Sequence, residues 1–421
     1  MITVRFKFFH SLRFCFPMSS KNGLNHIKFI SSCSKEGHMY QGNRCKQGII
    51  NPDKLDERSY STGQTRLKQK NEMVDFSVIN EGKKLKIAWS DGKTSNFHAV
   101  WLRFNCYCEE CCDPSSNMKS LTLHEMPLTS TIKSVQQKDD GTLVVQFVEE
   151  NHISSFGGDW LKQNCYSKES LKEMRESLKP VFYSDKYLPE LSYSDVKKSD
   201  EALYRWLKNI NEYGLCLLKD VPTEKDMLKT VIRHIGPVEQ SIYGETYELY
   251  VREVPINLAY SSKALQFHTD LPMYECPPGI QFLHCLKFDD TVKGGETTFA
   301  DLIHIAEEFR IINIKWSPPY HGPIALEEDL IEPFYRAFIL FGKAIENYKY
   351  KRAIRLVNGD VIAFNNRRVC HGRNSFENMH GERHLQGGYV NIDDYKSKLM
   401  ILHKKYGDGS PIRRVFNTDW S

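Results

Sequence analysis

Short apolar runs rich in β-branched residues, separated by polar turns, restrict the fold of this chain more than any other feature of its sequence. Three of these runs are PGIQFLHCLKF at 278–288, AIRLVNGDVIAFNN at 353–366 and QGGYVNI at 386–392. A predicted helix at 200–214 and a predicted strand at 215–221 precede them. Many short strands with Gly- and Pro-containing turns favour a β-sandwich or jelly roll over a parallel sheet. We therefore expect a mainly β domain with flanking helices.

A second group of short strands is predicted nearer the N-terminus. Two of its apolar runs are KLKIAWSDGKTSNF and GTLVVQFVEENHISSF, each with a polar turn. The Glu- and Lys-rich segment SKESLKEMRESLKP, at 167–180, predicts a helix that ends at Pro180 and joins two domains. We place a small N-terminal domain at 74–165 and a larger domain at 185–405.

The first 61 residues differ in charge from the rest of the chain. Residues 1–61 carry ten Lys and Arg but four Asp and Glu, so the formal charge of +4 for the whole chain becomes −2 without them. A basic, Ser-rich segment with scattered apolar residues is typical of a mitochondrial presequence. The stretch RSYST at 58–62 resembles a matrix-processing site. We therefore predict import into the mitochondrial matrix; an untargeted tail on a cytoplasmic protein is the alternative.

The composition of the remaining chain excludes several classes of function. A near-neutral body lacks the positive charge that nucleic-acid binding requires. No apolar run approaches the ~20 residues that span a bilayer. Of the twelve cysteines, three lie in the leader and four lie within 106–112, while the others are scattered. Scattered cysteines are usually buried free thiols. We expect no nucleic-acid partner, no membrane partner and a reducing compartment.

The strongest local motif is QFHTD at 266–270. In an extended segment, His268 and Asp270 point to the same face, so an imidazole and a carboxylate can hold one ion together. His371 follows the apolar run VIAFNN and can supply a second imidazole. Two histidines and one carboxylate form the facial triad of non-haem iron(II) oxygenases, which leaves coordination positions open. Each residue alone would more often be an ordinary polar residue of a loop.

The order of further motifs favours the iron site. PPG at 277–279 and GGET at 294–297 follow the first motif, and Arg383 lies 12 residues after His371. An arginine at this place can bind the distal carboxylate of a 2-oxo-dicarboxylate in bidentate fashion. A threonine hydroxyl can act as a second donor. The sequence thus predicts a site for iron and 2-oxoglutarate.

Seven stretches of the sequence match one known family. These stretches, which are distributed over most of 98–400, are AVWLRFNCYCEECC, WLKQNCYSKES, SIYGETY, NLAYSSKALQFHTDLP, PPGIQFLHCLK, VCHGRNSFE and RHLQGGYV. With this set, the chain resembles the γ-butyrobetaine and trimethyllysine dioxygenases, in the taurine-dioxygenase-like branch of 2-oxoglutarate oxygenases. The resemblance implies a double-stranded β-helix (jelly-roll) catalytic domain behind a small zinc-binding domain. It also implies a homodimer.

The activity implied by this resemblance is hydroxylation of γ-butyrobetaine to L-carnitine, with Fe(II), 2-oxoglutarate, O₂ and ascorbate. His268, Asp270 and His371 are the implied iron ligands, and the implied 2-oxoglutarate partners are Arg383, Thr297 and Leu283. The implied substrate contacts are Tyr243, Tyr247, Asn257, Tyr260 and Tyr389. We call the four tyrosines the aromatic cage. A trimethylammonium group has no hydrogen-bond donor and is best bound by aromatic faces, at roughly 0.5–2 kcal/mol per ring.

Two positions depart from the family pattern. Tyr247 stands where Trp is expected, and Leu271 stands where an aromatic residue is expected. Both changes weaken the cage without abolishing it, so trimethyllysine is the alternative substrate. Asn257 and the cysteine spacing favour γ-butyrobetaine, whereas the presequence favours trimethyllysine.

A cysteine cluster predicts a second metal site. Cys106, Cys108 and Cys111 place three thiolates within one turn, which suits tetrahedral zinc if a fourth ligand comes from elsewhere. His152 is the fourth ligand in the family pattern, whereas Cys112 adjoins a cysteine ligand, and adjacent cysteines rarely share one tetrahedral ion. With no open position, such a zinc is structural. A group of free thiols is the alternative.

One segment of the chain does not fit the family. Residues 302–332 replace a segment that is longer in the family by roughly forty residues, the length of several strands. The sequence IINIKWSPPYHGPI resembles the end of that segment. Either the gene model is mis-spliced, or the chain is an isoform with a damaged barrel. In the second case the protein is a catalytically inactive family member that still binds metal or ligand.

Overall fold

A computed structural model describes most of the chain after the leader. The described residues are 72–116, 118–120, 123–177, 188–255, 257–302, 313–348, 351–377, 381–410 and 412. The predicted presequence at 1–61 lies outside them, as does part of the segment predicted to be shortened. Within the described ranges, no helix combines the length and the apolar composition that a bilayer-spanning segment requires.

The N-terminal part consists of two small antiparallel sheets. Each of the two apolar runs predicted there becomes two strands with a turn between them. The first sheet contains β1 (Met73–Ile79), β2 (Lys84–Trp89) and β3 (Thr94–His98), and the second contains β4 (Ile132–Gln137), β5 (Leu143–Phe147) and β6 (Ile153–Phe156). Buried and exposed residues alternate along β3 and β5, as expected for strands with one face in a core. Leu85, Phe97 and Val145 belong to that core.

Three short helices complete this part: α1 (Ala99–Phe104), α2 (Gly158–Gln163) and α3 (Lys168–Ser177). The last of them lies within the segment that the sequence predicts to be helical. Trp101 of α1 and Trp160 of α2 have ring centroids 5.4 Å apart and pack against the core. The cysteine cluster follows directly after α1.

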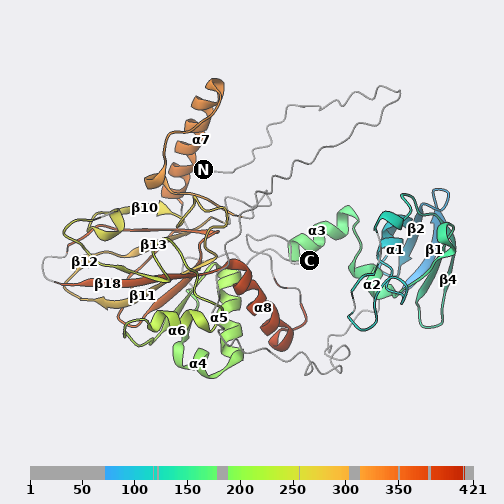
Figure 1. Cartoon of the computed structure of the whole chain (residues 1–421), viewed down its shortest axis with the longest axis horizontal. Coiled ribbons are helices and arrows are strands. Elements are labelled where there is room, and N and C mark those ends of the chain that lie inside the picture. Colours follow the sequence, from blue (N-terminus) through green and yellow to red (C-terminus); the bar gives the residue numbers. More distant parts are fainter. Residues whose placement is uncertain are drawn as a thin grey trace, which may run out of the picture. The chain divides into compact units, whose positions relative to one another are not determined.

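The larger part is a jelly roll, which confirms the predicted fold class (Figure 1). Its six-stranded sheet has the order β7 (Glu190–Ser192), β8 (Leu215–Lys219), β15 (Val361–Asn365), β11 (Ile280–Phe288), β18 (Arg383–Val390) and β9 (Thr246–Leu249). A four-stranded sheet has the order β10 (Leu265–His268), β16 (Val369–Arg373), β13 (Thr297–Asp301) and β14 (Arg352–Ile354). A short pair joins β12 (Lys293–Gly294) to β17 (Phe376–Glu377).

Apolar side chains from both sheets form one core between them. Phe299 of β13 and Phe364 of β15 meet edge to face, with ring centroids 5.1 Å apart. Leu283 and Leu385 belong to the same cluster. A sheet pair packed in this way leaves room for a ligand only where the apolar filling ends, and polar residues of β10, β13, β16 and β18 meet at that place.

Four helices cover the other face of the six-stranded sheet (Figure 1). They are α4 (Tyr193–Lys198), α5 (Asp200–Tyr213), α6 (Met227–Arg233) and α8 (Ile392–Tyr406). Helix α5 matches the predicted helix closely: the Ser199 side chain accepts a hydrogen bond from the Ala202 N–H, and Gly214 ends the helix with φ 77°. A left-handed residue at this position is the usual end of a helix and favours glycine.

A long helix, α7 (Glu328–Glu346), begins within the segment predicted to be shortened. It projects from the jelly roll near β10 (Figure 1). Apolar residues occur on all of its sides, and among them Leu330, Ile339 and Leu340 are exposed. The sequence interpretation included no helix here.

Candidate active site

The three predicted iron ligands come together at the end of β10. His268 is the last residue of β10 and pairs in register with His371 of β16, so the two imidazole rings lie 4.2 Å apart. Asp270 follows two residues later. One of its carboxylate oxygens, Oδ1, lies 3.3 Å from His268 Nε2 and 3.8 Å from His371 Nε2. One ligand atom from each of the three residues lies within 4.8 Å of the other two, which is close enough for all three to bind one metal ion.

The protonation states of these groups suit a metal cation. The Nδ1–H of His268 donates to the Gln266 carbonyl oxygen at 2.8 Å, which leaves the Nε2 lone pair directed toward the other ligands. Burial, followed by the proximity of His268, lowers the pKa of His371 to about 3, so this imidazole is neutral. Burial alone would raise the pKa of Asp270, but the two imidazoles beside its carboxylate outweigh burial. The pKa of Asp270 therefore lies well below its usual range.

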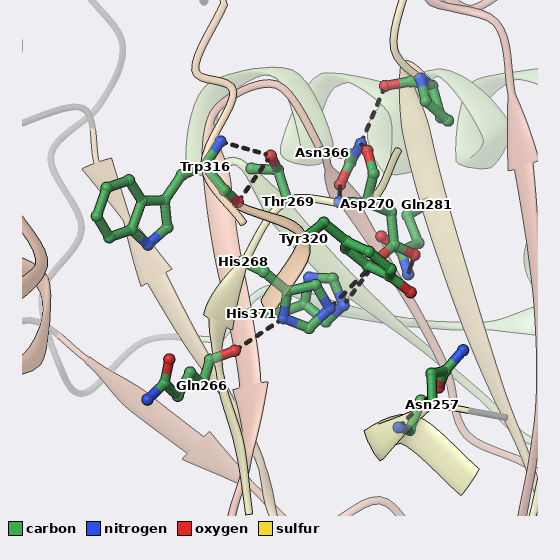
Figure 2. A network of polar contacts seen from close by, with 12 residues as sticks. Asn257, Gln266, His268, Thr269, Asp270, Gln281, Trp316, Tyr320, Asn366 and His371 are labelled. Atoms are coloured by element: carbon green, nitrogen blue, oxygen red, sulfur yellow. Dashed lines mark hydrogen bonds and ion pairs between the residues drawn. The ribbon is translucent and has the colours of Figure 1, made fainter. Parts of the chain in front are cut away.

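Neighbouring side chains hold the second oxygen of Asp270. Its Oδ2 accepts hydrogen bonds from Tyr389 Oη at 2.6 Å, Gln281 Nε2 at 2.6 Å and Tyr247 Oη at 3.3 Å. The Asn366 amide holds the backbone of Asp270 from both sides, accepting from its N–H at 2.8 Å and donating to its carbonyl at 3.0 Å (Figure 2). Only Oδ1 therefore remains for a metal.

Two buried arginines lie in the same pocket. Arg383 of β18 donates to the Gly295 carbonyl at 3.2 Å, and its Nη2 is 3.5 Å from Thr297 Oγ1. Arg373 of β16 binds four backbone carbonyls of 258–263. Burial, followed by the charge of Arg373, lowers the pKa of Arg383 to about 9. In the part of the chain that the structure describes, neither guanidinium forms an ion pair with a carboxylate. A small dianion such as 2-oxoglutarate fits this positive end of the pocket.

All eleven residues predicted for iron, 2-oxoglutarate and substrate line one cavity of about 350 Å³. Leu283 lies in its wall. The cage rings of Tyr243 and Tyr247 have centroids 5.5 Å apart, as do those of Tyr247 and Tyr389. The structure thus brings the predicted site together from six strands (β9, β10, β11, β13, β16 and β18) and the loops between them.

Sequence reasoning missed several residues of this cavity. They are Gln281, Tyr320 and Arg373 in its lining, and Asn366 behind Asp270. Arg373 could have been found, because it lies two residues after His371 in a strand and so shares its face. Gln281 likewise lies two residues before the predicted Leu283 in β11, whereas Tyr320 and Asn366 carry no spacing signal.

The four predicted zinc ligands also lie together. His152 Nε2 is 3.3 Å from Cys106 Sγ, 3.6 Å from Cys108 Sγ and 3.5 Å from Cys111 Sγ. The four ligand atoms lie within 4.8 Å of one another, and Cys112 is not part of the group. Three sulfurs and one nitrogen are a usual donor set for structural zinc.

The surroundings of the cysteines also suit a cation. Burial, and then the charge of Cys106, raises the pKa of the Cys111 thiol to about 12. A metal ion would remove this repulsion between crowded thiolates. Arg103 donates to Cys111 Sγ at 3.2 Å and forms an ion pair with Glu150 at 2.9 Å, which links the cluster to the loop of His152.

Two family models match the chain. The model of the taurine catabolism dioxygenases, TauD/TfdA family, matches residues 175–311 and 310–389, about half of the chain. The model of the N-terminal domain of γ-butyrobetaine hydroxylase-like proteins matches residues 77–148. The two segments of the first match meet at 310–311, inside the segment predicted to be shortened.

Individual relatives agree with these models. The chain is 29% identical over 363 residues to γ-butyrobetaine dioxygenase of Pseudomonas sp. (strain AK-1), covering 76% of this chain and 94% of that protein. It is 28% identical over 391 residues to the γ-butyrobetaine dioxygenase of Homo sapiens, with coverages of 81% and 99%. It is 25% identical over 354 residues to the mitochondrial trimethyllysine dioxygenase of Rattus norvegicus, with coverages of 73% and 82%. The chain belongs to the TauD/TfdA family and is a 2-oxoglutarate- and Fe(II)-dependent dioxygenase.

Proposed function

We propose that this dioxygenase hydroxylates γ-butyrobetaine to L-carnitine. The observation that carries the proposal is the aromatic cage beside the metal ligands, formed by Tyr243, Tyr247, Tyr260 and Tyr389. Among the described residues that line the cavity, Asp270 is the single carboxylate, and its oxygens are directed to the metal position and to the three donors described above. A cationic substrate therefore has aromatic faces rather than a carboxylate to bind. This is the recognition expected for a quaternary ammonium group.

The residues of the pocket have separate roles in binding and in orientation. Iron(II) held by His268, Asp270 and His371 would supply, with 2-oxoglutarate and O₂, the oxidation of a C–H bond. Arg383 and Thr297 orient the distal carboxylate of 2-oxoglutarate. Holding the reactants in one geometry in a cavity poor in water accounts for much of such catalysis. Ascorbate would keep the iron in its reduced form.

The hydrogen bonding of Asn257 favours γ-butyrobetaine as the substrate. Its side-chain oxygen accepts from the Ala259 N–H at 2.9 Å, which leaves the amide nitrogen as a donor for the carboxylate of this substrate. Trimethyllysine is the second candidate, because Tyr247 replaces the expected Trp and the relatives include trimethyllysine dioxygenases. Trimethyllysine carries an α-amino group in addition, for which the lining that the structure describes offers no second carboxylate.

The purified full chain tests the proposal directly. With Fe(II), ascorbate and 2-oxoglutarate, we expect succinate and L-carnitine in equal amounts from γ-butyrobetaine, and no product from the variant His371→Ala. Preferential hydroxylation of trimethyllysine would show that this compound, and not γ-butyrobetaine, is the substrate. An iron-loaded, folded chain that forms no succinate with either compound would instead be an inactive family member.

We also propose a compartment and an assembly for the protein. The basic leader supports import into mitochondria, and the names of related trimethyllysine dioxygenases include this organelle. Detection of a mature chain beginning near residue 62 in a mitochondrial fraction would support this location, and a cytoplasmic chain with an intact leader would contradict it. A homodimer remains the proposed assembly, to be tested by the mass of the purified protein in solution.

A further inference from the structure

We propose that Tyr320 is a fifth ring of the ammonium pocket, which closes the cage at its mouth and selects a cationic trimethylammonium group over a neutral group of equal shape. The proposal rests on the proposed function, since it concerns the recognition of the same substrate class. Tyr320 lies within the shortened segment 302–332, and neither its position nor its role follows from the sequence motifs. Three features of the structure support it.

The first feature is the anchoring of this segment to the iron-ligand strand. Thr269, which lies between two predicted iron ligands, donates its N–H to the Trp316 carbonyl at 2.6 Å. Trp316 N–H donates in return to Thr269 Oγ1 at 3.1 Å (Figure 2). Ile314 N–H also donates to the Arg367 carbonyl at 2.9 Å. The chain is thus fixed beside the metal ligands only four residues before Tyr320.

The second feature is the support of the same segment by helix α7. The Trp316 ring is buried and lies 4.6 Å from the Phe338 ring and 5.0 Å from the Phe341 ring. On the other side of Tyr320, the His321 ring stacks on Phe338 at 4.7 Å. A short 3₁₀ turn, Pro318–Tyr320, joins the two contacts, and its prolines restrict the backbone. The apolar helix α7 therefore holds both flanks of Tyr320.

The third feature is the place of the Tyr320 side chain in the cavity. It lines the pocket together with the aromatic cage, and its hydroxyl lies 3.5 Å from the Tyr243 hydroxyl. Tyr320 is 50% exposed, whereas Tyr260 is 4% exposed and Tyr389 is fully buried. Tyr320 thus stands between the buried rings and solvent. An aromatic face here also shields a bound cation from water, and cation–π attraction strengthens with desolvation.

Calorimetry on the full chain tests this role. The chain is loaded with Fe(II) and 2-oxoglutarate without O₂ and titrated with γ-butyrobetaine, with trimethyllysine, and with 5,5-dimethylhexanoate. The last compound, called the neutral analogue below, keeps the carboxylate of γ-butyrobetaine and has a neutral head group, with carbon in place of the ammonium nitrogen. We expect Tyr320→Leu to weaken binding of the cation by about 2- to 30-fold and to leave binding of the neutral analogue unchanged. Tyr320→Phe, which keeps the aromatic face, should bind the cation within about twofold of the native chain.

Tyr406→Leu is the matched control, because this half-buried tyrosine ends α8 and does not line the cavity. It should leave all three affinities unchanged. Equal weakening of cation and neutral analogue by Tyr320→Leu would show a purely steric role and overturn the proposal, while the proposed function would stand. Loss of cation binding in Tyr320→Phe would overturn it too. If the native chain binds neither trimethylammonium compound, the proposed substrate class and the role of Tyr320 both fail.

Discussion

At the residue scale, the two oxygens of Asp270 have different environments. Oδ1 faces the two histidines, while Oδ2 accepts three hydrogen bonds. Hydrogen bonds to a carboxylate are worth more than those between neutral groups. The donors thus fix which oxygen is offered to a metal and at what angle. Groups that orient a metal ligand in this way commonly change metal affinity when they are removed.

Gln281→Leu tests this arrangement. The change removes the amide that donates to Asp270 Oδ2 at 2.6 Å. We expect iron affinity to fall by about 10- to 100-fold and turnover at limiting iron to fall with it. Iron titration, with activity measured at each concentration, provides the readout. In the control Gln266→Leu, the altered side chain is exposed and the backbone carbonyl that accepts from His268 remains, so native affinity is expected. Similar iron affinity in both variants would contradict this role of Gln281.

Gly387 lies against the aromatic cage, where a larger residue would collide with one of its rings. A Cβ atom on Gly387 would overlap the Tyr247 ring, which lies against β18 there. Gly387→Ala should therefore displace this ring, at a cost of about 1–3 kcal/mol in stability. We expect a higher KM for the trimethylammonium substrate and a lower melting temperature, measured by steady-state kinetics and by calorimetry. Gly322→Ala is the control, since nothing lies within 4 Å of a Cβ at that glycine. An unchanged KM in Gly387→Ala would contradict the close contact.

At the element scale, the parts that could be predicted from the sequence are those with a regular period. The alternation of a strand places His268 and Asp270 on one face, and the pairing of β10 with β16 then adds His371. Helix α5 could be predicted from its apolar period and its serine cap. Helix α7 has a comparable apolar period, but Pro333 lies inside it, and a proline within a run argues against a helix. Asn366 acts through a contact with a distant part of the chain, for which a single sequence has no signal.

Strand β11 carries a buried histidine that makes stability depend on pH. Burial lowers the pKa of His284 to about 4, below the value of 6.5 for an exposed histidine. Between these pH values the unfolded chain binds a proton that the folded chain does not, so stability rises with pH. When the pH falls from 7 to 5, we expect the melting temperature of His284→Leu to decrease by less than that of the native chain. Thermal unfolding at several pH values measures this. The exposed His124, changed to Leu as a control, should leave the native pH dependence intact. If the melting temperature of His284→Leu depended on pH as steeply as that of the native chain, His284 would not be the source of this pH dependence.

At the scale of the whole molecule, the chain has two folded parts, and their ligand sets suit different metals. The jelly roll offers two nitrogens and one carboxylate with open positions, whereas the N-terminal part offers a closed set of three sulfurs and one nitrogen. The small N-terminal part has limited apolar surface to bury, and binding of a metal adds folding free energy. Loss of that metal is therefore expected to act on the N-terminal fold first, and on catalysis only through it.

Two adjacent cysteines allow this to be tested with a matched pair of variants. Cys111 lies within the four-residue ligand group, whereas Cys112 lies outside it, although both are buried. We expect Cys111→Ser to lose zinc, measured by elemental analysis, and to expose the segment 72–177 to limited proteolysis. Cys112→Ser should retain one zinc per chain and the native cleavage pattern. Both variants should still bind iron, because the facial triad lies in the jelly roll. Equal zinc content in the two variants would show that Cys111 is not a ligand. Zinc loss without increased cleavage would show that the N-terminal part folds on its apolar core alone.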